Sequence, residues 1–155
     1  MCAQQDVDRQ GRIPTVDDLR GRLLAGLPVT ERRFAVAGVS TAVLEGGHGP
    51  PVVFLQAEFA AVWMRVIPEL VRTHRVIAPD LPGLGASHVS NGPPRVDTVL
   101  TWVGELIEQT CPTPPVLVGK GAGGAIAARF AVDHSDSCRR WCWWTPTGWL
   151  GTDRH

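Results

Sequence analysis

The residues with the clearest potential for chemistry lie in the stretch VLVGKGAGGAIAARF, residues 116–130, where an apolar run meets a cluster of glycines. Two interpretations compete for this cluster. Gly119, Gly121 and Gly124 spell G-x-G-x-x-G, the fingerprint of a loop that holds the pyrophosphate of a dinucleotide at a helix N-terminus. Residues 119–123, GKGAG, also have the spacing of a nucleophile elbow, G-x-S-x-G, in which a strained strand-to-helix turn presents a nucleophilic side chain.

The place of the cluster in the chain favours the elbow. A dinucleotide fingerprint follows the first strand of a βαβ unit, with an acidic residue about 20 residues further on. Here the cluster follows the fifth predicted strand, and Asp133 and Asp136 come at the end of a helix. Lys120 is followed by glycine, so the phosphate-loop pattern Gly-Lys-Ser/Thr is absent. A nucleotide-binding α/β protein that uses the Gly119–Gly124 loop remains an alternative.

The elements that position this turn follow from the apolar pattern. Short apolar runs bounded by turn residues predict five strands, two within residues 32–47 and one each at 50–55, 75–80 and 113–119. Apolar residues at helical spacing predict helices at 15–24, 59–72, 96–107 and 123–134. The alternation of strand and helix from residue 50 predicts an α/β fold, a mostly parallel sheet of about five strands with crossover helices.

The composition limits the kind of partner. The chain has 155 residues, 44% of them hydrophobic and 19% charged, which is typical of a globular domain. Fifteen basic residues balance fifteen acidic ones, so charge gives no reason to expect nucleic acid or an anionic membrane. The polar start resembles no signal peptide, and no apolar run has the length of a membrane span. We therefore expect a cytoplasmic protein with reduced cysteines.

Three stretches resemble the α/β-hydrolase family. VVFL, residues 52–55, resembles that family's third strand. RVIAPDLPGLGAS resembles its DLPGHGxS stretch, with Leu84 where histidine is common, and PPVLVGKGAGGAIAARFA resembles LVGHSMGGxIAxxxA. The resemblance covers roughly residues 31–137, after an N-terminal arm and short helix at 1–30. It implies descent from enzymes that hydrolyse an ester or related bond without a metal or organic cofactor, and a small apolar molecule as the substrate or ligand.

The chain departs from that family at the residues that carry out the reaction. Gly121 occupies the position of the nucleophile, so the position is vacant, and Lys120 stands where histidine is usual. Gln56 and Ala57 replace the His-Gly pair that helps to form the oxyanion hole. The resemblance implies that these residues and Ala122 line the pocket, and that the family's acid and base follow later strands, which we expect this chain to lack. We therefore expect an inactive hydrolase, with a non-catalytic binding module as an alternative.

The last residues, 138–155, CRRWCWWTPTGWLGTDRH, show no clear periodicity and contain four of the six tryptophans. Trp141 to Thr145 must be encoded TGG TGY TGG TGG ACN, and reading from the third base gives Val-Leu-Val-Asp, a sequence suited to a sixth strand. The tail is therefore interpreted as a shifted reading frame. On this interpretation the strand at 113–119 becomes an exposed edge, the Trp63, Ile67 and Leu70 face is only partly covered, and the chain self-associates.

Other reactive side chains have simpler interpretations. Asp80 follows a strand and is expected to stabilise a turn rather than to position a substrate. Ser87 has no elbow around it and is expected to cap or bridge a turn. Lys120 is interpreted as a solvated lysine, with anion binding at the elbow as the alternative. His134, Cys138 and Cys142 share one helical face if the last predicted helix continues, a spacing that suits zinc, but a shifted frame accounts for the cysteines and no metal is expected.

Overall fold

The computed structural model describes residues 13–57, 63–90, 92, 94–145 and 148–152. Its centre is one mixed sheet of eight strands, in the order β1-β2-β4-β3-β6-β7-β8, with β5 paired to β2. The strands are β1 (Thr30–Val36), β2 (Val39–Gly46), β3 (Pro51–Gln56), β4 (Arg75–Pro79), β5 (His88–Val89), β6 (Val116–Lys120), β7 (Arg140–Thr145) and β8 (Gly148–Thr152). The helices are α1 (Val16–Leu24), α2 (Ile67–Leu70), α3 (Val96–Thr110) and α4 (Ala122–Asp133), followed by a 3₁₀ turn at Ser135–Ser137.

The five strands expected from the sequence are β1, β2, β3, β4 and β6, and the α/β class is confirmed. β1 and β2 form a hairpin whose two turn residues, Ala37 and Gly38, both have positive φ, as a tight two-residue turn requires. The four central strands lie side by side in the order β4, β3, β6, β7 and run parallel to one another. Every residue of β3 is buried, as expected for a central strand covered on both faces.

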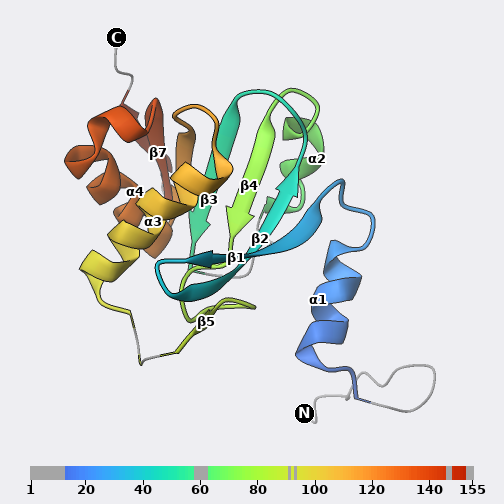
Figure 1. The fold of residues 1–155 in the computed structure, drawn as a ribbon. Coiled ribbons are helices and arrows are strands. Elements are labelled where there is room, and N and C mark those ends of the chain that lie inside the picture. The colour runs from blue at the N-terminus through green and yellow to red at the C-terminus, as the bar shows by residue number, and fades with distance from the viewer. Residues whose placement is uncertain (1–12, 58–62, 91, 93, 146–147, 153–155) are drawn as a thin grey trace.

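Figure 1 shows the sheet with its helices. Two hydrophobic cores lie on opposite faces of this sheet. The larger core joins the sheet to α3 and α4, with Trp102 and Phe130 fully buried in it. The smaller core lies on the α2 side, where the rings of Phe54 and Trp63 are 4.6 Å apart between centroids. The sheet is therefore covered by helical segments on both faces. No helix in the described part of the chain is long and apolar enough to cross a membrane.

The expected long helix at 59–72 is wrong in the part that the structure describes. Only Ile67–Leu70 is α-helical, and residues 58–62 lie outside the described residues. Pro68 explains the difference, because proline is tolerated in the first turn of a helix but clashes with the preceding turn within one. The expectation of a partly covered face is also wrong for Trp63 and Ile67, which are 4% and 0% exposed, whereas Leu70 is half-buried.

The expected exposed edge at residues 113–119 is wrong as well. β7 pairs in parallel with the whole of β6, from Val116 beside Arg140 to Lys120 beside Trp144. β8 then pairs antiparallel with β7. The segment lacks the alternation of a half-exposed strand, but tryptophan and threonine favour strands, and Trp141 packs against the core under α3 and α4. The tail therefore extends the sheet and covers the strand that carries the elbow.

Candidate functional site

The elbow expected from the glycine spacing is present. β6 ends at Lys120, Gly121 has φ 56° and ψ −125°, and α4 begins at the next residue. This is a conformation that glycine adopts at little cost and that other residues enter only under strain. A Cβ atom placed on Gly121 meets no atom within 4 Å, so the position has room for a side chain that the sequence does not supply.

The glycines on either side allow the close crossing that makes the turn sharp. A Cβ atom on Gly119 would lie 2.6 Å from the backbone oxygen of Gly123, and a Cβ atom on Gly123 would lie 2.5 Å from the backbone nitrogen of Gln56. The N-terminus of α4 therefore touches both its own strand, β6, and the end of the neighbouring strand, β3. Glycine at 119 and 123 is required by packing, whereas glycine at 121 is only favoured, by the backbone conformation.

The residues named for the pocket meet at this edge of the sheet. Gln56 and Lys120 are register partners at the carboxyl ends of β3 and β6, and Ala57 and Ala122 lie directly beyond these ends. Ala57, Gly121 and Ala122 are exposed and Lys120 is half-buried, so Lys120 is not the fully solvated lysine expected. Gln56 is 2% exposed, and neither its amide nitrogen nor its amide oxygen has a hydrogen-bond partner.

Asp80 and Ser87 have the structural roles expected of them. The Asp80 carboxylate is buried and accepts a hydrogen bond from the Ala86 backbone nitrogen at 2.8 Å. The Ser87 hydroxyl donates to the Asp80 carbonyl at 2.7 Å and accepts from the Ala42 nitrogen at 3.0 Å. Both polar side chains thus hold the loop after β4 in place. The Ser87 hydroxyl already serves as both a hydrogen-bond donor and an acceptor.

A third side chain, Arg20, joins Asp80 and Ser87 at this loop and could not be recognised from local sequence patterns. Arg20 of α1 is nearly buried and pairs with Asp80 at 2.7 Å and with Glu31 of β1 at 2.7 Å. Glu31 lies in β1 and Asp80 follows β4, so the helical periodicity of α1 contains no information about either partner of Arg20. The ion pairs attach α1 to the loop after β4.

No described histidine lies within reach of the elbow. His134 follows the last residue of α4 and is 13 residues after Gly121, so it lies about 20 Å along the helix from Gly121. His88 is in β5, which pairs with β2 beside β4 and so lies about 10 Å from β6, two strand spacings away. His48 and His74 precede β3 and β4, at the opposite edge of the sheet. A general base must come within about 3 Å of the proton it takes.

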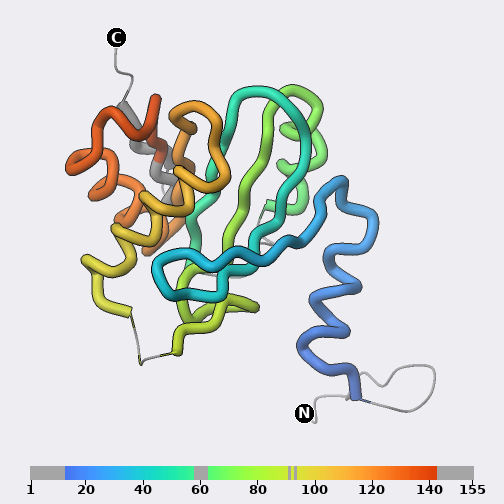
Figure 2. The backbone as a smooth tube through the Cα atoms, viewed as in Figure 1, coloured from blue at the N-terminus to red at the C-terminus, as the bar shows by residue number. Residues whose placement is uncertain are grey.

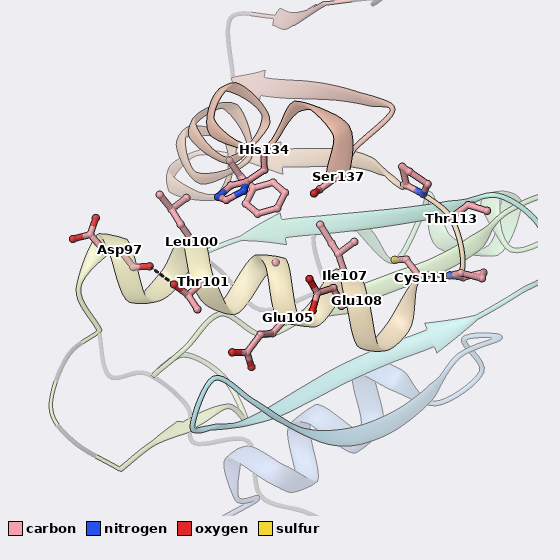
Figure 3. Close-up of a pocket in the computed structure, with 14 residues that line it drawn as sticks. Asp97, Leu100, Thr101, Glu105, Ile107, Glu108, Cys111, Thr113, His134 and Ser137 are labelled. Carbon is pink, nitrogen blue, oxygen red and sulfur yellow. Dashed lines mark hydrogen bonds between the residues drawn. The ribbon is translucent and has the colours of Figure 1, made fainter.

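A hollow of about 590 Å³ lies elsewhere, between α3 and the end of α4 (Figure 3). Its lining includes the carboxylates of Asp97, Glu105 and Glu108 and the side chains of Cys111 and His134. Figure 3 shows Cys111 and His134 at different ends of the hollow, and burial raises the pKa of the Cys111 thiol, which therefore stays protonated at neutral pH. This hollow contains no activated thiol.

The helical arrangement of His134, Cys138 and Cys142 is wrong. α4 ends at Asp133, a 3₁₀ turn follows, and Cys142 lies in β7, so the three residues do not share a helical face. Across the described residues no group of three or more histidine, cysteine, aspartate or glutamate side chains is arranged to hold a metal ion.

The sheet order, the elbow and the loop after β4 together define the class of protein. A family model described as the alpha/beta hydrolase fold matches residues 50–141, more than half of the chain. The chain therefore belongs to the α/β-hydrolase family. The expectation drawn from the three sequence stretches is confirmed.

Relatives with assigned reactions are similar over most of this chain. It is 33% identical to the 2-hydroxymuconate semialdehyde hydrolase of Pseudomonas sp. (strain CF600) over 124 residues, which are 73% of this chain and 42% of that protein. It is 32% identical to the soluble epoxide hydrolase of Corynebacterium sp. (strain C12), covering 72% of this chain and 40% of that one. The chain thus spans about two fifths of the length of these relatives.

Solved structures show the same fold. A structure described as a putative lipase from Acinetobacter baumannii AYE superimposes with a TM-score of 0.77, at 20% sequence identity, over 91% of this chain and 48% of that one. At this identity the similarity concerns the fold alone.

Proposed function

We propose that this chain is an α/β-hydrolase-family protein that does not hydrolyse esters by the covalent mechanism its ancestors used. One observation carries the proposal: the residue in the strained elbow, with φ 56°, is Gly121. Covalent hydrolysis begins when a side-chain oxygen or sulfur at this position attacks the substrate carbonyl. Glycine has no such atom, so the first bond of the intermediate cannot form there.

The residues beside the elbow do not replace the missing nucleophile. Ala122 has no reactive atom, and Lys120 is half-buried at the end of β6. The hydroxyl of Ser87 is held by two hydrogen bonds. A serine nucleophile also needs a base in contact with it. The histidines of the described chain are at the other edge of the sheet, in β5, or at the far end of α4.

We infer that binding of a small apolar ligand is the activity that such a site retains. Gln56 supports this inference, because its buried amide lacks hydrogen-bond partners and an unsatisfied buried polar group costs about 1–3 kcal/mol. A ligand carbonyl or hydroxyl that reaches Gln56 would recover part of this cost. The relatives are named for small organic substrates, a hydroxymuconate semialdehyde, which carries a carboxylate, and an epoxide, so they support the small size of the ligand and not its polarity.

The tail is proposed to derive from a shifted reading frame of a longer hydrolase gene. The codons required by Trp141 to Thr145 support this proposal, since the alternative frame encodes an apolar strand at the position where β7 runs. Sequencing the coding DNA through residues 130–155 in independent isolates tests it. An unshifted frame in some isolates supports the proposal, and the same frame in all of them argues against it.

Substituting serine at the elbow is expected to give no ester turnover. Gly121→Ser restores the nucleophilic oxygen, and the position has room for it, but no described histidine is placed to take its proton. The measurement is release of nitrophenol from a short-chain nitrophenyl ester by the wild-type chain and by the variant, with circular dichroism to show that both are folded. We expect both rates to equal that of the buffer.

One result would contradict the expectation that Gly121→Ser is inactive. Turnover by Gly121→Ser that disappears when one histidine, for example His88, is replaced by alanine would show that a base is available and that only the nucleophile is missing.

A further inference from the structure

Gln56 differs from the other buried polar side chains in the part of the chain that the structure describes. The Thr41 hydroxyl accepts a hydrogen bond from the ring nitrogen of Trp102 at 2.9 Å. The Thr110 hydroxyl donates to the Leu106 carbonyl at 2.7 Å, and the buried side chains at the loop after β4 are paired as well. Gln56 alone in this set, at 2% exposure, has a partner for neither its amide nitrogen nor its amide oxygen. The great majority of buried polar groups are paired, so this amide points to a partner that the chain does not supply.

β3 lies in the middle of the sheet (Figures 1 and 2), and its side chains alternate between the two cores. Val53 and Leu55 belong to the core under α3 and α4. Val52 and Phe54 belong to the core on the α2 side. Because successive side chains of a strand point to opposite faces, the Gln56 amide shares the face of Phe54. The amide therefore lies on the α2 side of the sheet, and the helix of the elbow, α4, lies on the other side.

The surroundings of the amide combine apolar walls with one charge. Phe54, two residues before Gln56 on the same face, packs its ring against that of Trp63, with the centroids 4.6 Å apart. Lys120 is the register partner of Gln56 on β6 and is half-buried. Ala57, the next residue, is exposed, so Gln56 lies one residue below the surface at the end of β3. Apolar walls around a few polar groups are typical of a small-molecule site.

We infer that the ligand of this site presents a hydrogen-bond donor and an acceptor side by side, as a primary amide or a lactam does. The inference rests on the proposed function, since it names the polar group of the small ligand proposed there. The Gln56 amide offers N–H donors and a carbonyl oxygen in a single plane. A primary amide or a lactam matches both at once through two parallel N–H···O bonds, one in each direction.

Other polar groups of similar size leave part of the Gln56 amide without a partner. A ketone, an ester or an epoxide only accepts hydrogen bonds, so it serves the amide nitrogen and leaves the amide oxygen unpaired. A carboxylate has the same defect, although the charge of Lys120 would attract it. A site built to hydrogen-bond an N–H group rejects analogues that lack it, because its own buried groups then stay unpaired. The N–H group of the ligand is therefore the feature that selects it.

Matched ligands test the inference on the purified chain. ε-Caprolactam carries its N–H and C=O groups side by side, and N-methyl-ε-caprolactam keeps the ring and the carbonyl but lacks the N–H. Hexanoate is a carboxylate with as many carbons as ε-caprolactam. Dissociation constants come from ligand-detected nuclear magnetic resonance titrations. We expect ε-caprolactam to bind at least about fivefold more tightly than either of the others, the effect of about one net hydrogen bond.

Variants of Gln56 add a measurement that needs no ligand. Gln56→Leu removes both polar atoms at similar volume, so it should abolish the preference for ε-caprolactam. It should also unfold at a higher urea concentration than the wild-type chain, because a buried amide without a partner is removed. Gln56→Met keeps the length of the side chain and tests the same loss should the branched leucine not fit. Gln109 is the matched control: its exposed amide donates to the Ala35 carbonyl at 3.1 Å, so Gln109→Leu should neither alter the preference nor raise the urea midpoint.

The possible failures are distinguishable. Equal binding of ε-caprolactam and N-methyl-ε-caprolactam, or tighter binding of hexanoate, would overturn the inference and leave the proposed binding of a small ligand standing. Binding of none of the three would overturn both. A lower urea midpoint for both Gln56→Leu and Gln56→Met would also overturn the inference, because it would show that the amide already has a partner in the free chain.

Discussion

Alanine at position 123 is expected to unfold the chain or to destabilise it by about 3 kcal/mol or more, the upper end of the cost of overpacking. The added Cβ atom would overlap the carbonyl group of Leu55 and lie 2.5 Å from the nitrogen of Gln56. Both are backbone groups of β3, a strand held by β4 on one side and β6 on the other. β3 cannot retreat without breaking these ladders, so the overlap cannot be relieved by turning a side chain.

Position 121 provides the matched control, two residues away in the same turn. An alanine Cβ there meets nothing within 4 Å, so the variant carries only the backbone strain of its positive φ, about 1–3 kcal/mol. Urea denaturation followed by circular dichroism measures both variants. We expect Gly121→Ala to shift the midpoint slightly and Gly123→Ala to shift it much further or to abolish the transition. Equal midpoints for the two variants would show that the helix and β3 are not in the contact described.

Ending the chain at Arg139 is expected to remove cooperative unfolding. The deletion takes away β7 and β8, leaving β6 with unpaired backbone groups along a parallel edge. It also removes Trp141, a half-buried side chain that packs against the core under α3 and α4, and so exposes apolar surface of that core to water. The stability of a whole domain is only about 5–15 kcal/mol, so we expect the combined loss of strand pairing and packing to abolish the cooperative transition.

A shorter deletion distinguishes the contribution of β7 and β8 to stability from the effect of shortening the tail. A chain ending at Thr152 keeps both strands. We expect it to melt like the full chain by near-ultraviolet circular dichroism, whereas the chain ending at Arg139 loses its sharp transition and aggregates. A chain ending at Arg139 that melts at the temperature of the full chain would mean that β7 and β8 contribute nothing to the fold.

Local patterns predicted the elements that depend on local rules. The period of apolar residues located α3 and α4, and the proline-bounded apolar runs located β3 and β6, because burial on one or both faces leaves a direct record in sequence. The elbow was predictable because its spacing of glycines is short and the central position needs positive φ. The expected long helix at 59–72 is wrong because Pro68 restricts the helix to a short segment, although the apolar residues around it have helical spacing.

Features that depend on distant partners were not predictable in this way. Arg20 looks like an ordinary helix residue until the fold brings Asp80 beside it. The codons of residues 141–145 bear on the origin of the tail and not on its structure. A segment of high strand propensity that lies beside an open strand pairs with that strand whatever its origin. The burial of Gln56 next to the half-buried Lys120 likewise depends on how β3 and β6 align.

The central claim, that this chain keeps an α/β-hydrolase elbow but has no activated serine to take the place of the missing nucleophile, is tested most directly by mass spectrometry of the intact chain after incubation with a fluorophosphonate. The reagent forms a stable adduct with activated serine side chains and needs no knowledge of the natural substrate. We predict that the mass of the native chain is unchanged, as is that of a urea-unfolded control. A stoichiometric adduct on the native chain that is absent from the unfolded control would contradict the claim, because it would show an activated serine outside position 121.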